Sequence, residues 1–106
     1  MQHGGAPPPG RQWAFLTNHA RVLWWLWVRP DSRMRDVAAA VGITERAAQR
    51  IVGELVEEGY VTRTRRGARN SYRVHLDVPM RHANHRDIEV GRLLELLGPR
   101  TGPGTD

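Results

Sequence analysis

Three polar residues, Arg46, Gln49 and Arg50, lie close together in the sequence and carry side chains suited to reading DNA bases. An arginine guanidinium can donate two parallel hydrogen bonds to the edge of guanine, and a glutamine amide can pair in the same way with adenine. Thr44 and Glu45 directly precede them, and Glu45 can either accept from cytosine or stabilise the start of a helix. These five residues form a candidate surface for base recognition; a solvated helix face is the alternative.

A second group of arginines surrounds Gly67. Arg65, Arg66 and Arg69 could lay guanidinium groups along DNA phosphates or into a narrow minor groove, or could simply keep an exposed turn soluble. All 16 basic residues are arginine, and the formal net charge is +5. This basic balance suits a nucleic-acid partner, and an arginine-only set equally fits a GC-rich genome.

Side chains for other chemistry are sparse. The chain has no cysteine and no lysine, and its serines are Ser32 and Ser71, so thiolate and Schiff-base catalysis are excluded and no catalytic residue is predicted. His82, His85 and Asp87 have spacing that could hold a divalent metal, but a polar helix start is the commoner outcome. We therefore predict a protein that is not an enzyme and uses no metal or cofactor.

The scaffold for the first group is a predicted helix-turn-helix. Val37 and Val41 are four residues apart and therefore share one face of a first helix, expected over residues 35–41. Ala38 is small enough for a second helix to cross close by. Gly42 can adopt the left-handed conformation that ends a helix without steric cost.

The second helix is expected over residues 45–58. Thr44 is a suitable N-cap, and Gly59 is a suitable C-terminal stop. Its predicted buried face consists of Ala48, Ile51 and Leu55. The polar residues of the first group then project outward from its first two turns.

A β-hairpin is predicted directly after this helix. Two half-buried strands are expected, over residues 60–65 and about 70–75. In the first, Val61, Arg63 and Arg65 alternate with Tyr60, Thr62 and Thr64, and in the second, Tyr72 and Val74 stand on either side of Arg73. The arginines around Gly67 would therefore stand at the tip of a wing.

Helices are also expected on both sides of this motif. Thr17 can cap a helix that runs to about Arg29 and is stopped by Pro30, with His19 as a cap or phosphate contact. A last helix is expected to begin near residue 84 or 85 and to end at 98–99.

These flanking helices carry more apolar surface than one small domain can cover. Residues 22–28 are apolar around the whole helix, and Gly91 in the last helix permits close helix approach. We therefore predict that the N- and C-terminal helices form a homodimer interface. Its predicted residues are Trp24, Trp25, Trp27, Ile88, Val90, Leu93, Leu94 and Leu97.

The organisation along the chain is simple. Residues 1–11 are rich in proline and glycine and are expected to be a flexible arm, residues 12–98 a single domain, and residues 99–106 a flexible tail. The longest apolar run, 22–28, is far shorter than the ~20 residues of a membrane span. With no cysteine and no signal peptide, the protein is expected in the cytoplasm.

The order of the predicted helices and strands resembles that of a known protein family. Over residues 13–97, the segments WAFLTNHARVL, DVAAAVGITERAAQRIVGELVEEGYVTRTR and GARNSYRVH are similar to winged helix-turn-helix bacterial transcription regulators of the MarR-like kind. The resemblance implies a mainly α fold with a small β-hairpin. It also implies a dimer that places one helix per subunit in the major groove of double-stranded DNA and the wing over the minor groove. A tryptophan-lined pocket for a small aromatic effector is a further implication.

The sequence thus predicts a sequence-specific, double-stranded DNA-binding transcriptional regulator. The alternative is a winged-helix module for protein–protein interaction, because one fold can serve both functions. Such an adaptor would gain nothing from arginines clustered around one groove-sized surface, which favours DNA.

Overall fold

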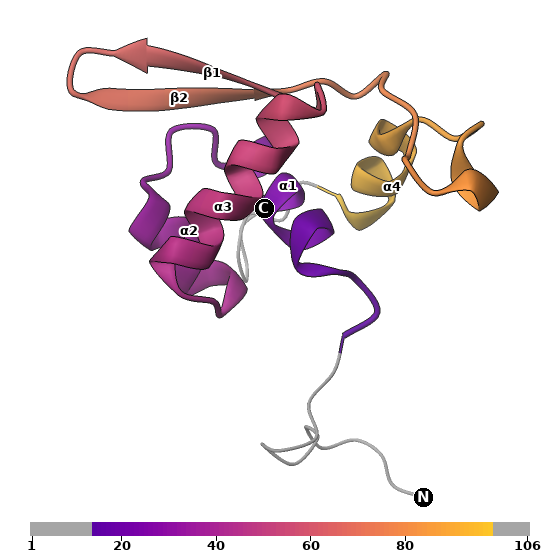
Figure 1. Cartoon of the computed structure of the whole chain (residues 1–106), viewed down its shortest axis with the longest axis horizontal. Coiled ribbons are helices and arrows are strands. Elements are labelled where there is room, and N and C mark those ends of the chain that lie inside the picture. The colour runs from indigo at the N-terminus through magenta and orange to yellow at the C-terminus, as the bar shows by residue number, and fades with distance from the viewer. Residues whose placement is uncertain (1–13, 99–106) are drawn as a thin grey trace, which may run out of the picture.

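The computed structural model describes residues 14–98, which form a helix-turn-helix followed by a β-hairpin and a last helix (Figure 1). The elements are α1 (Asn18–Val28), α2 (Met34–Val41), α3 (Glu45–Glu57), β1 (Val61–Arg66), β2 (Arg69–Val74), the 3₁₀ helix η2 (Ala83–His85) and α4 (Val90–Leu97). The predicted mainly α fold with a small β-hairpin is confirmed. The expected arm at 1–11 and tail at 99–106 lie outside the described residues. Within 14–98, no helix has both the length and the apolar character to cross a membrane.

Local caps set the ends of the first three helices. The Thr17 hydroxyl accepts a hydrogen bond from the Ala20 N–H at 3.1 Å, and the Thr44 hydroxyl accepts from the Ala47 N–H at 3.0 Å. Both satisfy backbone donors that a helix start leaves unpaired. Gly42 ends α2 with a left-handed φ of 86°, so the turn to α3 is tight. The bounds agree with prediction to within one residue: α1 ends at Val28 and not at Arg29, α2 begins one residue earlier, and α3 ends one residue earlier.

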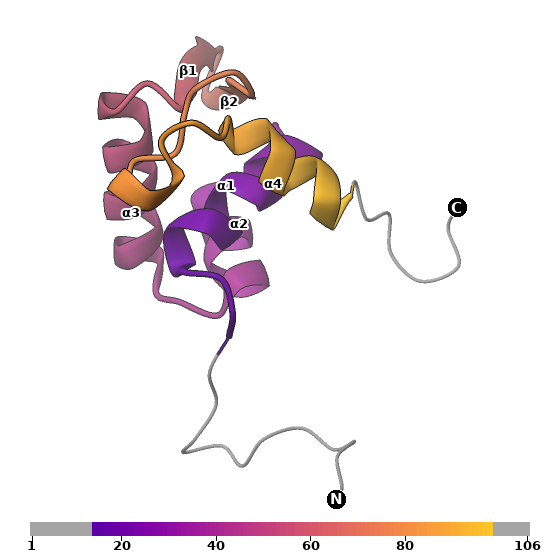
Figure 2. The same ribbon diagram turned by 90° about the vertical axis from the view of Figure 1, so that its right-hand side faces the viewer.

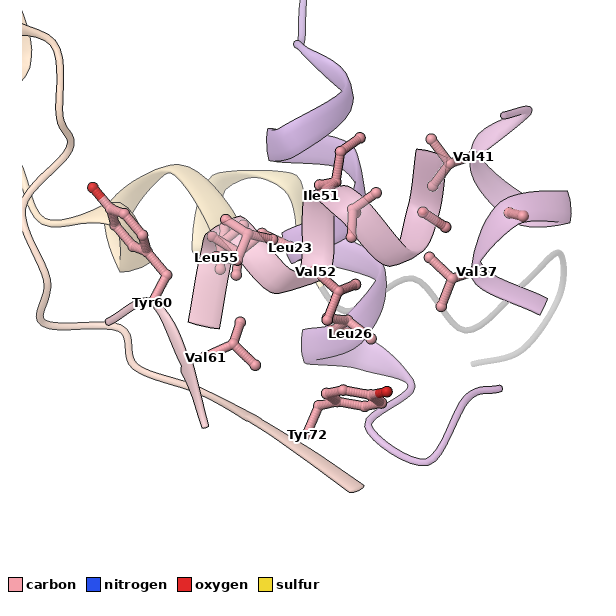
Figure 3. Close-up of a cluster of buried hydrophobic side chains, with 14 of the residues drawn as sticks. Leu23, Leu26, Val37, Val41, Ile51, Val52, Leu55, Tyr60, Val61 and Tyr72 are labelled. Atoms are coloured by element: carbon pink, nitrogen blue, oxygen red, sulfur yellow. The ribbon is translucent and has the colours of Figure 1, made fainter. Parts of the chain in front are cut away.

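One hydrophobic core joins the helices to the hairpin (Figure 3). The central contribution comes from α3, whose Ala48, Ile51, Val52 and Leu55 are all buried. Around them pack Val22, Leu23 and Leu26 of α1, Val37, Ala38 and Val41 of α2, and Tyr60, Val61 and Tyr72 beside or within the hairpin. Because this stripe of α3 is buried, the rotation of α3 about its own axis is determined by packing.

The hairpin is antiparallel and pairs Val61 with Val74 at its base and Arg66 with Arg69 at its tip. Each strand is shifted by one residue from its predicted bounds. The remaining two residues, 67–68, make the turn, and the hairpin extends over α2 (Figure 1). The middle of β2 is held to the α1–α2 turn, because the Tyr72 N–H donates to the Pro30 carbonyl at 2.9 Å.

The last helix begins later than predicted. The expected start near residue 84 or 85 is wrong, because η2 occupies only 83–85 and α4 begins at Val90. An antiparallel bridge between Pro79 and Glu89 closes the segment between them, and the Met80 N–H donates to the Ile88 carbonyl at 2.9 Å. These backbone hydrogen bonds hold residues 79–89 as a closed loop, so a helix cannot run through them.

Helix α4 lies beside α1 (Figure 2), and the Trp24 indole N–H donates to the Gly98 carbonyl at 2.8 Å. Val90 and Leu94, predicted to face a partner chain, are 6% and 0% exposed, and their side chains belong to the core of this chain. Gly91 does permit a close approach, but the neighbour is Leu76 of the same chain. The surface of α4 that is left for a partner is therefore smaller than predicted.

The close contact at Gly91 makes a testable prediction. A Cβ added there would lie 2.7 Å from both the Cβ and the carbonyl oxygen of Leu76, so Gly91→Ala should lower the free energy of unfolding by about 1–3 kcal/mol. Gly53→Ala is the matched control, because nothing lies within 4 Å of its added Cβ and alanine favours a helix interior by about 0.5–1 kcal/mol. Urea denaturation should therefore give effects of opposite sign. Equal effects would contradict this packing.

Candidate nucleic-acid interface

The start of α3 presents a polar face to solvent. Arg46, Gln49 and Arg50 are all exposed, as are Thr44 and Glu45 at the first turn. The structure thus brings the five predicted base-reading residues to one end of one helix. The Thr44 oxygen is already engaged as the helix cap, although its hydroxyl proton is still able to donate.

A carboxylate further along α3 engages one of these arginines. The Arg50 guanidinium lies 3.4 Å from one oxygen of Glu54, and the other oxygen lies 2.6 Å from His19 Nε2. His19, expected as a helix cap or phosphate contact, therefore joins α1 to α3. Sequence reasoning missed Glu54. The i,i+4 spacing to Arg50 could have indicated that pair, but the contact with His19 has no local signal.

This network changes the acidity of the carboxylate. The hydrogen bond with His19 is the largest influence and lowers the pKa of Glu54; partial desolvation opposes it, and the positive charge of Arg50 adds to the lowering. Glu54 is thus a negative group set among the basic residues of the proposed DNA face. It forms an ion pair with Arg50 one helical turn away.

The three wing arginines differ in what they contact. Arg65 donates through Nε to the Gly67 carbonyl at 2.9 Å, and Arg69 donates through Nη2 to the Asp31 carbonyl at 2.7 Å. The Arg66 side chain is exposed and makes no polar contact with the residues that the structure describes. Two of the guanidinium groups are therefore already oriented by the protein, while that of Arg66 can turn toward a ligand.

The turn between α1 and α2 supports the base of the wing. Its Ser32 hydroxyl accepts a hydrogen bond from the Trp25 indole N–H at 3.0 Å, and the Arg29 guanidinium lies over the Trp25 ring, 5.5 Å from its centroid. The same turn supplies the carbonyls that accept from β2. The half-buried Trp25 of α1 thus holds the turn at Ser32, and the neighbouring Pro30 and Asp31 of that turn hold the wing.

Two of the tryptophans also line a pocket of about 310 Å³. Its walls include Arg21, Trp24 and Trp25 of α1, Ala40 and Val41 of α2 and Leu97 of α4. Arg21 is held there by a 2.6 Å hydrogen bond to the Val41 carbonyl. No residue of α3 lines this pocket, so it is separate from the polar face of that helix.

Several large apolar side chains remain at the surface around α4. Leu96 is 85% exposed and Ile88 is 39% exposed, whereas Leu93 and Leu97 are partly covered. Sequence reasoning missed Leu96 because it lies between the positions of the apolar stripe. The exposed apolar surface of α4 is therefore centred on a residue outside the predicted set.

The histidines near the last helix act locally. The His82 ring accepts a hydrogen bond through Nδ1 from the Asn84 N–H at 3.1 Å, and its centroid is 5.5 Å from that of His85. Over residues 14–98, no group of three or more His, Cys, Asp or Glu side chains is arranged to hold a metal ion.

The Glu54 network makes a prediction about pH. Because the folded pKa lies below the ordinary value of 4.5, the stabilisation by ionised Glu54 is fully present above pH 4.5 and is lost as the pH falls through the folded pKa. The difference in unfolding free energy between the wild type and Glu54→Gln should therefore shrink on acidification. Thermal unfolding from pH 7 to pH 3 measures it. Glu57→Gln, exposed on the same helix, is the control; an identical pH dependence for both variants would contradict the network.

Comparison with known proteins agrees with this geometry. No curated protein matches the chain. The family model described as MarR family matches residues 15–69, which run from before α1 to the start of β2 and include the whole helix-turn-helix. This match covers more than half of the chain, and the observed elements form the winged helix-turn-helix. The chain therefore belongs to the MarR family.

Proposed function

We propose that this protein is a sequence-specific transcriptional regulator that binds double-stranded DNA, with α3 in the major groove and the wing on the flanking backbone or minor groove. Members of the MarR family are transcription regulators, not enzymes. The observation that carries the proposal is the exposed face of Arg46, Gln49 and Arg50 on a helix whose opposite face is buried. Acting on DNA in a bacterial cell, the protein would work in the cytoplasm.

The contacts supply two kinds of recognition. The side chains of Arg46 and Gln49 make no polar contact with the described residues and can donate to base edges, whereas Arg50 would exchange Glu54 for a base or a phosphate. The wing arginines lie beyond α3 along the chain and suit phosphate or the minor groove, where contacts give affinity more than sequence preference.

We also propose a homodimer formed by the terminal helices. The exposed apolar surface of Leu96 and Ile88, with the partly covered Leu93 and Leu97 and the tryptophans of α1, is the part of the predicted interface that a second copy could still cover. A two-fold dimer would place two recognition helices on inverted half-sites, about one helical turn or ~34 Å apart.

A second candidate is regulation of this DNA binding by a small aromatic effector. The pocket beside α1 supports it, because two indole rings and the Arg21 guanidinium converge there in a volume of about 310 Å³. Titration calorimetry with benzoate tests it. Saturable heat that Trp24→Ala abolishes would support this use of the pocket, and its absence at millimolar benzoate would count against it.

The DNA-reading face makes a prediction about specificity. Arg46→Ala should cost roughly 1–3 kcal/mol on the preferred duplex, because a bidentate base contact is lost, and should relax the preference at one or two base pairs. Selection from random duplexes followed by titration measures both effects.

Arg92→Ala is the matched control, since Arg92 is exposed on α4 and outside the proposed DNA face. A uniform loss of affinity for Arg46→Ala across all duplexes would make this arginine a phosphate contact. A wild-type protein that binds no duplex at low salt would contradict the proposed function and favour the protein–protein interaction module.

The dimer makes a prediction about mass. Sedimentation at micromolar concentration should give about twice the chain mass of 12.0 kDa, and Leu96→Glu should halve it by placing a charge in the apolar interface. Glu95→Ala, on the adjacent exposed position, should leave the dimer intact. Leu94 is unsuitable for this test, because it is fully buried and a charge there would destabilise the core of the chain itself. A monomeric wild type would contradict the dimer.

A further inference from the structure

A groove of about 310 Å³ lies between the wing and the turn that joins α1 to α2. We call it the turn–wing groove. It is lined by Ser32, Arg33 and Met34 on the side of the turn and by Arg69, Asn70 and Tyr72 on the side of the wing. In Figure 1 the hairpin extends over α2 and the turn leading into it, the two parts of the chain that supply the lining residues.

Hydrogen bonds hold the two walls of this groove at a set separation. The Tyr72 N–H donates to the Pro30 carbonyl at 2.9 Å, and the Arg69 guanidinium donates to the Asp31 carbonyl at 2.7 Å. Ser32 is itself held by the Trp25 indole N–H. Contacts within the protein therefore define the shape of the groove, so a ligand would bear little cost of ordering it.

The polar groups in the groove are mainly donors. Arg33 is exposed, and neither its guanidinium nor the Asn70 amide makes a hydrogen bond with the described residues. The Ser32 oxygen accepts from Trp25, which leaves its hydroxyl proton able to donate. The nearest acidic side chain along the turn is the exposed Asp31. Its single negative charge is outnumbered by the two positive guanidinium groups of Arg33 and Arg69. This donor-rich, net positive set matches an anion with several acceptor oxygens, such as phosphate.

We propose that the turn–wing groove binds a backbone phosphate of the same DNA duplex that α3 reads, with Arg33 as its main contact. The inference rests on the proposed function. It adds the turn between α1 and α2 to α3 and the wing as a part of the fold that contacts DNA. Continuity favours DNA as the source of the phosphate, because Arg69 belongs both to the groove and to the wing surface proposed to lie on the backbone. The groove would thus fix the position of the duplex without reading its sequence.

The test compares Arg33→Ala with Arg92→Ala, which removes an exposed arginine from α4. Binding to the preferred duplex and to an unrelated duplex is measured across a series of salt concentrations. Arg33→Ala should reduce the slope of log K against log salt by about one unit and weaken both duplexes by the same factor. Arg92→Ala should change neither quantity. A wild-type slope for Arg33→Ala would overturn the proposal.

Neutral methylphosphonate linkages placed one at a time in the preferred duplex locate the contact. One position should weaken the wild type and leave Arg33→Ala unaffected; equal sensitivity of the two proteins at every position would overturn the assignment. The variants also separate the two proposals. Altered base preference in Arg46→Ala, together with an unchanged salt slope in Arg33→Ala, would reject the groove alone, whereas a wild type that binds no duplex would reject both.

Discussion

The burial of one stripe of α3 is the constraint on which the remaining structure depends. Ile51 and Val52 are packed between α1, α2 and the base of the hairpin, so α3 can neither rotate nor slide without opening the core. Each neighbouring element meets this stripe, and each therefore takes its orientation from it. The polar residues at the start of α3 are presented to solvent in a defined orientation, because the opposite face of the helix is fixed in the core. The orientation of these surface residues is therefore a consequence of packing in the interior.

Features that depend on neighbours in the sequence could be predicted from it. Thr17, Thr44 and Gly42 act within one turn of their own position, and the helix bounds that they set were predicted to within one residue. The start of α4 could not be predicted, because the bridge from Pro79 to Glu89 removes the preceding residues from the helix although their periodicity fits one.

In the candidate site, too, local features could be predicted from the sequence and long-range contacts could not. Exposure of the arginines followed from helical and strand periodicity, but their existing contacts did not. Arg69 reaches a carbonyl 38 positions away, and the partner of Glu54 on α1 is 35 positions away. No spacing rule connects residues so distant, since only the packing of α1 against α3 and of the wing against the turn brings them together. The sequence therefore predicts which groups are available, and the fold decides which of them are already engaged.

The wing is a sheet of two strands, and its two edges differ in whether another part of the chain contacts them. The outer edge of β2 meets the α1–α2 turn through Tyr72, whereas the outer edge of β1 has no neighbouring strand among the described residues. An open edge can template the addition of a strand from another molecule, and charged side chains are a common protection against this. The arginines of β1 supply that charge, so the residues proposed to hold DNA would also keep the protein from aggregating through its wing. Solubility would then set a limit on how far evolution could neutralise the wing, even in a relative that had lost its DNA target.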